Sequence, residues 1–218
     1  MRIKVISLWH PHAWAMQHEH KKYETRNGGF INLPGVRKYR GPIAIHSAKQ
    51  KFDPLDYEPQ FGRQLKQDGL RPEGLVYGAI LAVADWTEIH RTEDVRGNLS
   101  QKELMYGNYE DERFAIEITN LRRLATPMLV RGHQGLFYWD VPPDLADELR
   151  LSKCDCVTCP NAGMPWRVTV PRVPGKERQE CGSSVCIFRF CSDCYNARKK
   201  VFTPEAIFTY ADQEVAHV

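Results

Sequence analysis

Seven cysteines are the residues whose spacing most directly predicts a chemistry. They crowd into residues 154–194 of a 218-residue chain. Two C-x-x-C pairs, Cys156 with Cys159 and Cys191 with Cys194, stand 31 residues apart. A C-x-x-C turn lets two thiolates bind one ion, so two such pairs predict a closed, structural zinc site with four thiolate ligands. Zinc would supply folding free energy to a segment with little apolar sequence.

The remaining cysteines, Cys154, Cys181 and Cys186, are alternates that could replace one of these ligands or share a second ion. An iron–sulfur cluster and unligated thiols are the other interpretations of the cysteine pattern. Between the two pairs, residues 168–181 (VTVPRVPGKERQEC) are rich in Pro, Gly and charge, which predicts an extended loop.

A second reactive group is the stretch KKYETR, residues 21–26. In a strand, alternation would place Lys22, Glu24 and Arg26 on one face and Lys21 and Thr25 on the other. A carboxylate between two cations fits either a salt-bridged surface or the polar floor of a cleft. A lysine close to a threonine could also act as the base that activates a hydroxyl nucleophile.

A third group lies in YRGPIAIHSAK, residues 39–49, where a short strand delivers His46, Ser47 and Lys49 to one end. Cleavage of RNA without a metal needs a base for the 2′-hydroxyl and a cation for the phosphorane. These three residues could serve if they converge with Tyr39 or Arg40. A histidine in an apolar strand is otherwise a structural hydrogen-bonding residue.

The elements that must position these groups form an α+β pattern. Strands are expected at residues 2–8, 42–46, 76–83 and 114–119, because these stretches are apolar and rich in β-branched residues. Residues 129–140 are expected to form a turn and a last strand. Helices are expected at residues 11–20 and within residues 53–65, each with a proline in its first turn. Pro142 and Pro143 then predict a domain boundary.

Composition sets the outer limits. The chain is 42% hydrophobic and 11% aromatic, enough to fill a small core. Its net charge of +3 is uneven, because residues 150–200 carry 10 Lys and Arg against 4 Asp and Glu. Such a basic segment could bind a phosphate backbone or simply be a solvated surface. No apolar run is long enough for a membrane span and no signal peptide is evident, so a cytoplasmic protein is expected.

Six stretches, taken in their order along the chain, resemble the ASCH family, a branch of the PUA-like small β-barrels. Besides the two polar stretches above, they are SLWHPHAWAM (7–16), GAILAVADW (78–86), ERFAIEITN (112–120) and VRGHQGLFYWD (131–140). The resemblance implies a PUA-like small β-barrel with flanking helices at residues 1–145. After this domain we expect the zinc-binding appendage predicted from the cysteines, at residues 150–200, and a tail at residues 201–218.

The same resemblance implies that the cleft between the early helix and the barrel receives nucleic acid, most simply RNA, with aromatic residues as stacking surfaces. The expected binding residues are Trp9, Lys21, Lys22, Arg26, Arg40 and Lys49. Trp14 and the aromatic residues of the strands are expected in the core.

Two enzymatic alternatives and one binding alternative stay open. Some ASCH proteins are associated with RNA cleavage, and one ASCH-like group is similar to an N4-acetylcytidine amidohydrolase with a K-x-x-T pair. Lys22 and Thr25 have that spacing. Alignment on Arg26 instead selects Lys21 and Glu24, which leaves no nucleophile. The candidate catalytic residues are therefore Lys21, Lys22, Glu24, Thr25, His46 and Lys49. An adaptor that binds a protein through the zinc segment is the third alternative.

Overall fold

The computed structural model describes residues 1–149, 166–171, 185–190 and 207–210. Its principal sheet contains β1 (Arg2–Leu8), β2 (Tyr23–Arg26), β3 (Gly41–Ser47), β4 (Ala79–Arg91), β5 (Phe114–Leu129) and β6 (Leu136–Asp140). The strand order is β2-β5-β4-β3-β1-β6. β1 and β3 pair in parallel, whereas β5 pairs antiparallel with β2 and β4, so the sheet is mixed.

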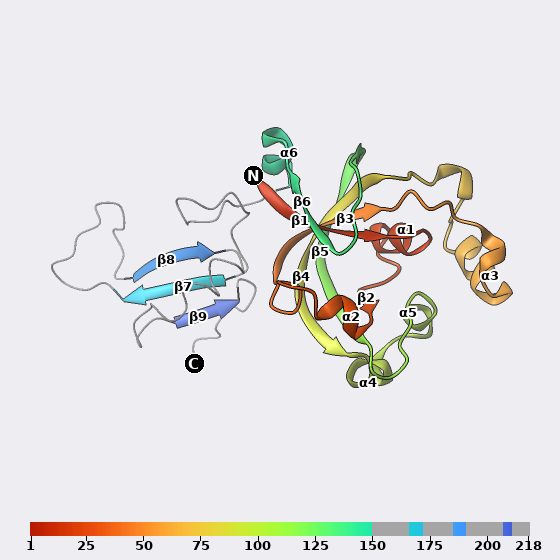
Figure 1. Cartoon of the computed structure of the whole chain (residues 1–218), viewed down its shortest axis with the longest axis horizontal. Coiled ribbons are helices and arrows are strands. Elements are labelled where there is room, and N and C mark those ends of the chain that lie inside the picture. Colours follow the sequence, from red (N-terminus) through yellow and green to blue (C-terminus); the bar gives the residue numbers. More distant parts are fainter. Residues whose placement is uncertain (150–165, 172–184, 191–206, 211–218) are drawn as a thin grey trace. The chain divides into compact units, whose positions relative to one another are not determined.

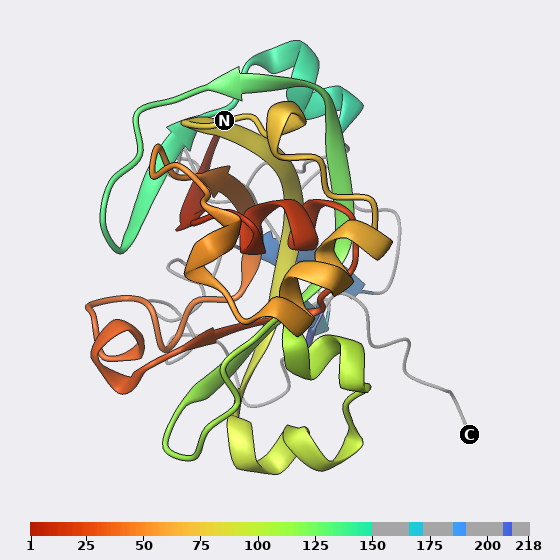
Figure 2. The ribbon, with the colours of Figure 1, turned by 90° about the vertical axis from the view of Figure 1, so that its right-hand side faces the viewer.

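The sheet curls into a half-barrel because its two longest strands are irregular (Figures 1 and 2). The pairing of β4 with β5 shifts register at three places, between Ile80 and Ala82, Val83 and Asp85, and Trp86 and Ile89. Each shift adds twist and bends the strand. Both strands are longer than the sequence predicts, since β4 continues to Arg91 and β5 to Leu129.

The helices of this part of the chain are α1 (His12–Gln17), α2 (Gly28–Ile31), α3 (Pro59–Gln67), α4 (Thr92–Val95), α5 (Gln101–Met105) and α6 (Pro143–Glu148). α1, α3 and α5 pack together through buried residues that include Trp14, Phe61, Leu65 and Tyr106. Trp86 and Trp139 are also buried, as expected for aromatic residues of strands. The same expectation is wrong for Tyr138, which is 40% exposed. Short 3₁₀ helices lie at Pro54–Asp56, Pro72–Gly74 and Arg96–Asn98.

A curled mixed sheet with flanking helices is the α+β architecture that the sequence predicts. The helix expected within residues 53–65 begins later, at Pro59, after the 3₁₀ turn at Pro54–Asp56. The mostly polar residues 87–91 continue β4, and the chain leaves the sheet only after Arg91. No helix in the described ranges is long and apolar enough to cross a membrane.

The chain divides into two compact units. One comprises Ile3–Arg37 and Ile43–Trp139, and the other comprises Met1–Arg2, Lys38–Pro42 and Asp140–Val218. The second unit contains a sheet of order β8-β7-β9, formed by β7 (Trp166–Pro171), β8 (Val185–Phe190) and β9 (Ile207–Tyr210). The loop expected over residues 168–181 is therefore wrong for residues 168–171, whose β-branched Val and Thr residues form part of β7.

The predicted zinc site falls largely outside the described residues. Cys186 lies in β8, opposite Val170 of β7. The other cysteines (Cys154, Cys156, Cys159, Cys181, Cys191 and Cys194) lie in the ranges that are not described. The zinc site, and the boundaries of the cysteine-rich segment and the tail, stay predictions.

Candidate functional site

Two cavities open side by side in the first unit. The larger has a volume of about 510 Å³ and the smaller about 300 Å³. They share four lining residues, Ser7, Trp9, Arg26 and Phe30, and so adjoin each other; together they are called the cleft. The larger is completed by His46, Ala48, Lys49 and residues 131–135, and the smaller by Leu8, His12, Glu24, Thr25, Asn27 and Arg113.

The parallel pairing of β1 with β3 explains why the chain assembles a site here. Ser7 pairs with His46, and Leu8 with Ser47, at the C-terminal ends of the two strands. Since parallel strands end at the same edge of a sheet, the residues that follow them, Trp9 and Lys49, also reach that edge. The loop between β5 and β6 also lines the larger cavity, with Arg131 and His133.

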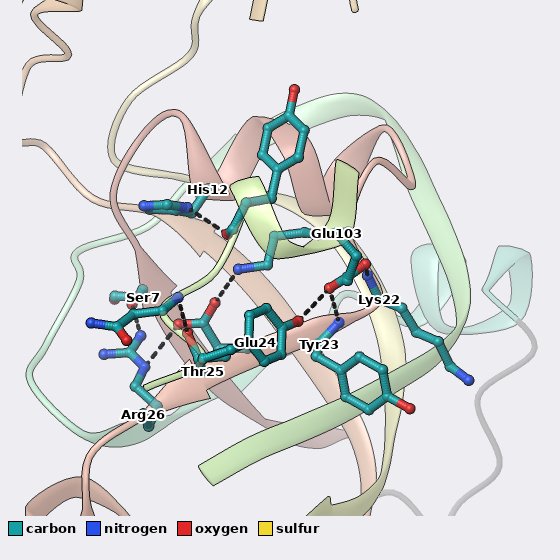
Figure 3. A network of polar contacts seen from close by, with 12 residues as sticks. Ser7, His12, Lys22, Tyr23, Glu24, Thr25, Arg26 and Glu103 are labelled. Atoms are coloured by element: carbon teal, nitrogen blue, oxygen red, sulfur yellow. Dashed lines mark hydrogen bonds and ion pairs between the residues drawn. The ribbon is translucent and has the colours of Figure 1, made fainter. Parts of the chain in front are cut away.

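The floor of the smaller cavity contains a buried group of charges around Glu24 (Figure 3). Lys21 Nζ donates to Glu24 Oε2 at 2.9 Å, with the two side chains only 2% and 9% exposed. Arg26 Nε lies 2.9 Å from Glu24 Oε1 as an ion pair, and its Nη2 donates to the Ser7 carbonyl at 3.0 Å. One carboxylate thus holds two cations at the end of β1.

The lowered pKa of Glu24 predicts that the free energy of unfolding depends on pH. Burial alone would raise this pKa, but Lys21 and Arg26 outweigh burial and lower it from 4.5 to about 2. A carboxyl whose folded-state pKa is depressed stabilises the protein above the unfolded pKa and loses that contribution as pH falls through the folded value. We therefore expect the free energy of unfolding to fall by about 3 kcal/mol from this group between about pH 5 and pH 2.

Urea denaturation at several pH values in this range measures that loss. Glu24→Gln has no titrating carboxyl at this position and is expected to show a shallower slope of unfolding free energy against pH. Equal slopes for the two proteins would rule out Glu24 as the source.

His12 supplies the smaller cavity with a neutral ring. Burial, with repulsion from Lys21, lowers the pKa of His12 to about 4, so the imidazole is uncharged at neutral pH. Its Nδ1 lies 3.1 Å from the carbonyl oxygen of Tyr106, which can only accept, so Nδ1 carries the proton. Nε2 is then left as a hydrogen-bond acceptor.

The two lysines of the KKYETR stretch do not lie on the faces that strand alternation predicts for them. Lys21, rather than Lys22, joins Glu24 and Arg26, while Lys22 is 53% exposed and pairs with Glu117 at 2.6 Å. The strand begins only at Tyr23, so alternation does not extend back to the two lysines. Figure 3 shows Lys22 directed away from Arg26.

Thr25 lines the smaller cavity, and its hydroxyl accepts a hydrogen bond from the Asn108 backbone at 3.0 Å. In the described part of the chain, no hydrogen bond joins it to Lys21 or Lys22. Lys21 Nζ instead bonds to Glu24. Lys21 and Glu24 are the pair that alignment on Arg26 selects, and in the structure they are bonded to each other.

Glu103, which the sequence analysis did not single out, fixes the start of β2. Its carboxylate accepts from the backbone N–H groups of Lys22 and Tyr23 at 2.7 and 3.1 Å and from the Tyr109 hydroxyl at 2.7 Å (Figure 3). Glu103 is buried in α5, whose N-terminus is capped by Ser100. A buried acid with three donors is recognisable only once the strand and the helix are known to meet.

The larger cavity combines exposed aromatic surface with uncommitted positive charge. Trp9 is 64% exposed, and the Arg26 guanidinium lies 4.8 Å from the Phe30 ring centroid. Lys49 lies over Gly78, and neither Lys49 nor Arg131 forms an ion pair with another residue of the described ranges. These two side chains are therefore available to an anion. Arg131, Phe30 and Ser7 also line this cavity and are not among the site residues predicted from the sequence.

A serine and a histidine meet on the wall of this cavity. Ser7 Oγ lies 3.0 Å from His46 Nδ1, and His46 Nε2 lies 3.0 Å from the Val130 carbonyl oxygen. Burial lowers the pKa of His46. Gly132 packs closely against the ring. A Cβ at position 132 would lie 2.5 Å from His46 Cε1, so a residue larger than glycine would clash with the ring.

The remaining candidates for RNA cleavage are not brought into the cleft. Ser47 is fully buried, and its hydroxyl bonds to the backbone of Ala79 at 3.2 Å. The Tyr39 hydroxyl donates to the Pro42 carbonyl, and Arg40 Nη1 donates to the Tyr39 carbonyl at 2.7 Å. Arg40 lines neither cavity. Across residues 1–149, no cluster of three His, Cys, Asp or Glu residues is arranged to hold a metal ion.

No family model matches the sequence, and no curated protein matches it. Similar solved structures are ASCH proteins. The crystal structure of ASCH from Zymomonas mobilis is 15% identical, covers 67% of this chain and 92% of that chain, and gives a TM-score of 0.38. A serine-to-alanine and a tyrosine-to-phenylalanine mutant of that protein give 15% and 16% identity, 67% coverage of this chain, 93% and 95% coverage of theirs, and TM-scores of 0.37.

Proposed function

We propose that the cleft binds single-stranded RNA. The observation that carries the proposal is an exposed indole, Trp9, in one cleft with two uncommitted cations, Lys49 and Arg131. A base stacks on a flat aromatic face while cations hold the adjacent phosphate, which is how single strands are bound without a demand for sequence. A paired base could not reach the indole, because its faces are covered by its neighbours in the stack.

The smaller cavity supports the proposal with groups suited to the edge of a base. His12 Nε2 is an unprotonated acceptor, while the Asn27 side chain and the Arg26 guanidinium stand on the same walls. An acceptor and donors on the walls of one cavity can bind the hydrogen-bonding edge of an unstacked base. The negative charge of Glu24 is already offset by Lys21 and Arg26, so it does not repel a polyanion.

A titration of the full chain with labelled single-stranded RNA tests the proposal, with single-stranded and duplex DNA alongside. Trp9→Ala is expected to weaken RNA binding by about 1–3 kcal/mol, or about 10- to 100-fold, because one stacking platform is lost. Trp9 is exposed, so this change leaves the core intact.

Tyr138→Ala is the matched control, since Tyr138 is also an exposed aromatic residue but lines neither cavity. Equal affinities for the Trp9 and Tyr138 variants would contradict stacking on Trp9. The absence of salt-sensitive binding to any of the three polymers would contradict the proposed function itself.

A further inference from the structure

The junction of the two cavities contains a serine that lines both. Ser7 is half-buried and lines each cavity. Its Oγ lies 3.0 Å from His46 Nδ1, within the range expected for a nucleophile and its general base. Ser47 provides the contrast, because it is sealed in the core and bonded to Ala79 in the manner of a structural serine.

The second nitrogen of the ring determines where the proton of His46 resides. A carbonyl oxygen only accepts hydrogen bonds, so the contact between His46 Nε2 and the Val130 oxygen places the proton on Nε2. Nδ1 therefore presents its lone pair to Ser7 Oγ. This is the tautomer that a base must have before it takes a proton from the hydroxyl. The hydroxyl has two acceptors within reach, Nδ1 at 3.0 Å and the His133 carbonyl oxygen at 3.4 Å, and Nδ1 is the nearer.

The ring is also held in place on its other sides. Gly132 packs against Cε1, and Phe137 contacts the ring edge-on at 5.9 Å between centroids. The Val130 carbonyl has the orienting role that a carboxylate has in a Ser-His-Asp triad. Arg131 and Lys49 bring positive charge to the same cavity, where an oxyanion or a phosphate would be stabilised.

We propose that Ser7 and His46 are the nucleophile and general base of a hydrolase that removes an acyl group esterified to a nucleotide. The inference rests on the proposed function, because a nucleotide is the part of the substrate that the cleft would bind. Lys49 and Arg131 would hold its phosphate.

The reaction balances without a cofactor. Ser7 Oγ attacks the acyl carbon and its proton passes to His46 Nδ1. The ester C–O bond breaks, and the leaving nucleotide oxygen takes the proton from His46. Water then attacks the acyl-Ser7 ester and gives one proton to His46, which returns it to Ser7 Oγ as the carboxylic acid leaves.

Covalent labelling with a fluorophosphonate tests the nucleophile on the full chain. Intact mass and peptide mapping are expected to show one adduct at Ser7, none at that position in Ser7→Ala, and labelling slowed at least about 100-fold in His46→Gln. Thr87→Val, which alters a hydroxyl outside the cleft, is expected to label at the wild-type rate. Thermal unfolding of each variant checks that it is folded.

A substrate assay tests the nucleotide part. The probes are acetyl esters on the ribose of adenosine monophosphate and of adenosine, with acetate release as the readout. The phosphorylated ester is expected to react about tenfold faster, and Lys49→Ala/Arg131→Ala is expected to remove that difference. Equal rates for the two esters in the wild-type protein would overturn phosphate recognition.

RNA titration separates failure of this inference from failure of the proposed function. RNA binding that persists in Ser7→Ala, with labelling and acetate release lost, supports both. A folded wild-type protein that binds RNA but is not labelled at Ser7 overturns the nucleophile and leaves the proposed function standing. Labelling at Ser7 without RNA binding overturns the proposed function, and with it the nucleotide as substrate.

Discussion

Replacing Glu24 with glutamine is expected to lower the free energy of unfolding by about 3–5 kcal/mol, the largest effect on stability that we predict for a polar side chain of the cleft. The change leaves the Lys21 ammonium, which is 2% exposed, without its counter-charge in a desolvated site. Arg26 loses its ion pair with the same carboxylate. Chemical denaturation at neutral pH measures the loss.

Lys22→Met is the matched control, because Lys22 belongs to the same stretch but forms a partly exposed pair with Glu117. It is expected to cost less than about 1 kcal/mol. A double variant, Lys21→Met/Glu24→Leu, removes both buried charges and is expected to be more stable than Glu24→Gln. If Glu24→Gln and Lys22→Met lower the free energy of unfolding by similar amounts, the buried pair contributes no more to stability than the exposed pair.

The second large effect is expected on RNA binding. Lys49→Ala/Arg131→Ala should weaken RNA binding at least about tenfold, because charge-assisted hydrogen bonds to phosphate are lost. Removing two phosphate contacts should also reduce the slope of log affinity against log salt concentration by about 1.4 for a single strand. Titrations at several salt concentrations measure both quantities.

Arg63→Ala/Lys66→Ala removes the same charge from α3, where both cations are exposed and line neither cavity of the cleft. This variant should keep nearly the wild-type slope. If the slope of log affinity against log salt concentration falls equally in both double variants, RNA binding is spread over the surface and not localised in the cleft. Lys21 is unsuitable for such a test, since its burial against Glu24 makes a loss of binding inseparable from a loss of fold.

The sequence predicts the local elements well because their signals are local. β1 has the predicted bounds Arg2–Leu8, and β3 differs by one residue at each end. The bounds of β4 and β5 are less predictable, because the polar ends of these strands are stabilised by each other across bulges rather than by apolar alternation. Strand pairing of that kind has no signature in either segment alone.

The cleft is predictable only in part, for a related reason. Trp9, Arg26, His46 and Lys49 stand out by residue type, and the structure brings these four together on one cavity. Ser7 becomes notable only when the register places it opposite His46. Arg131 stands in a turn more than eighty residues from His46 in sequence, so its presence depends on how β5 and β6 fold back.

The contact between Glu103 and β2 bears on which parts of the chain can vary in length. Residues 92–113, between β4 and β5, look like an insertion that could be shortened without harm. Glu103 in that segment receives the backbone N–H groups of Lys22 and Tyr23, which would otherwise be left without an acceptor. A relative with a shorter connection must therefore supply another acceptor at this point, and any design that trims the connection must do the same.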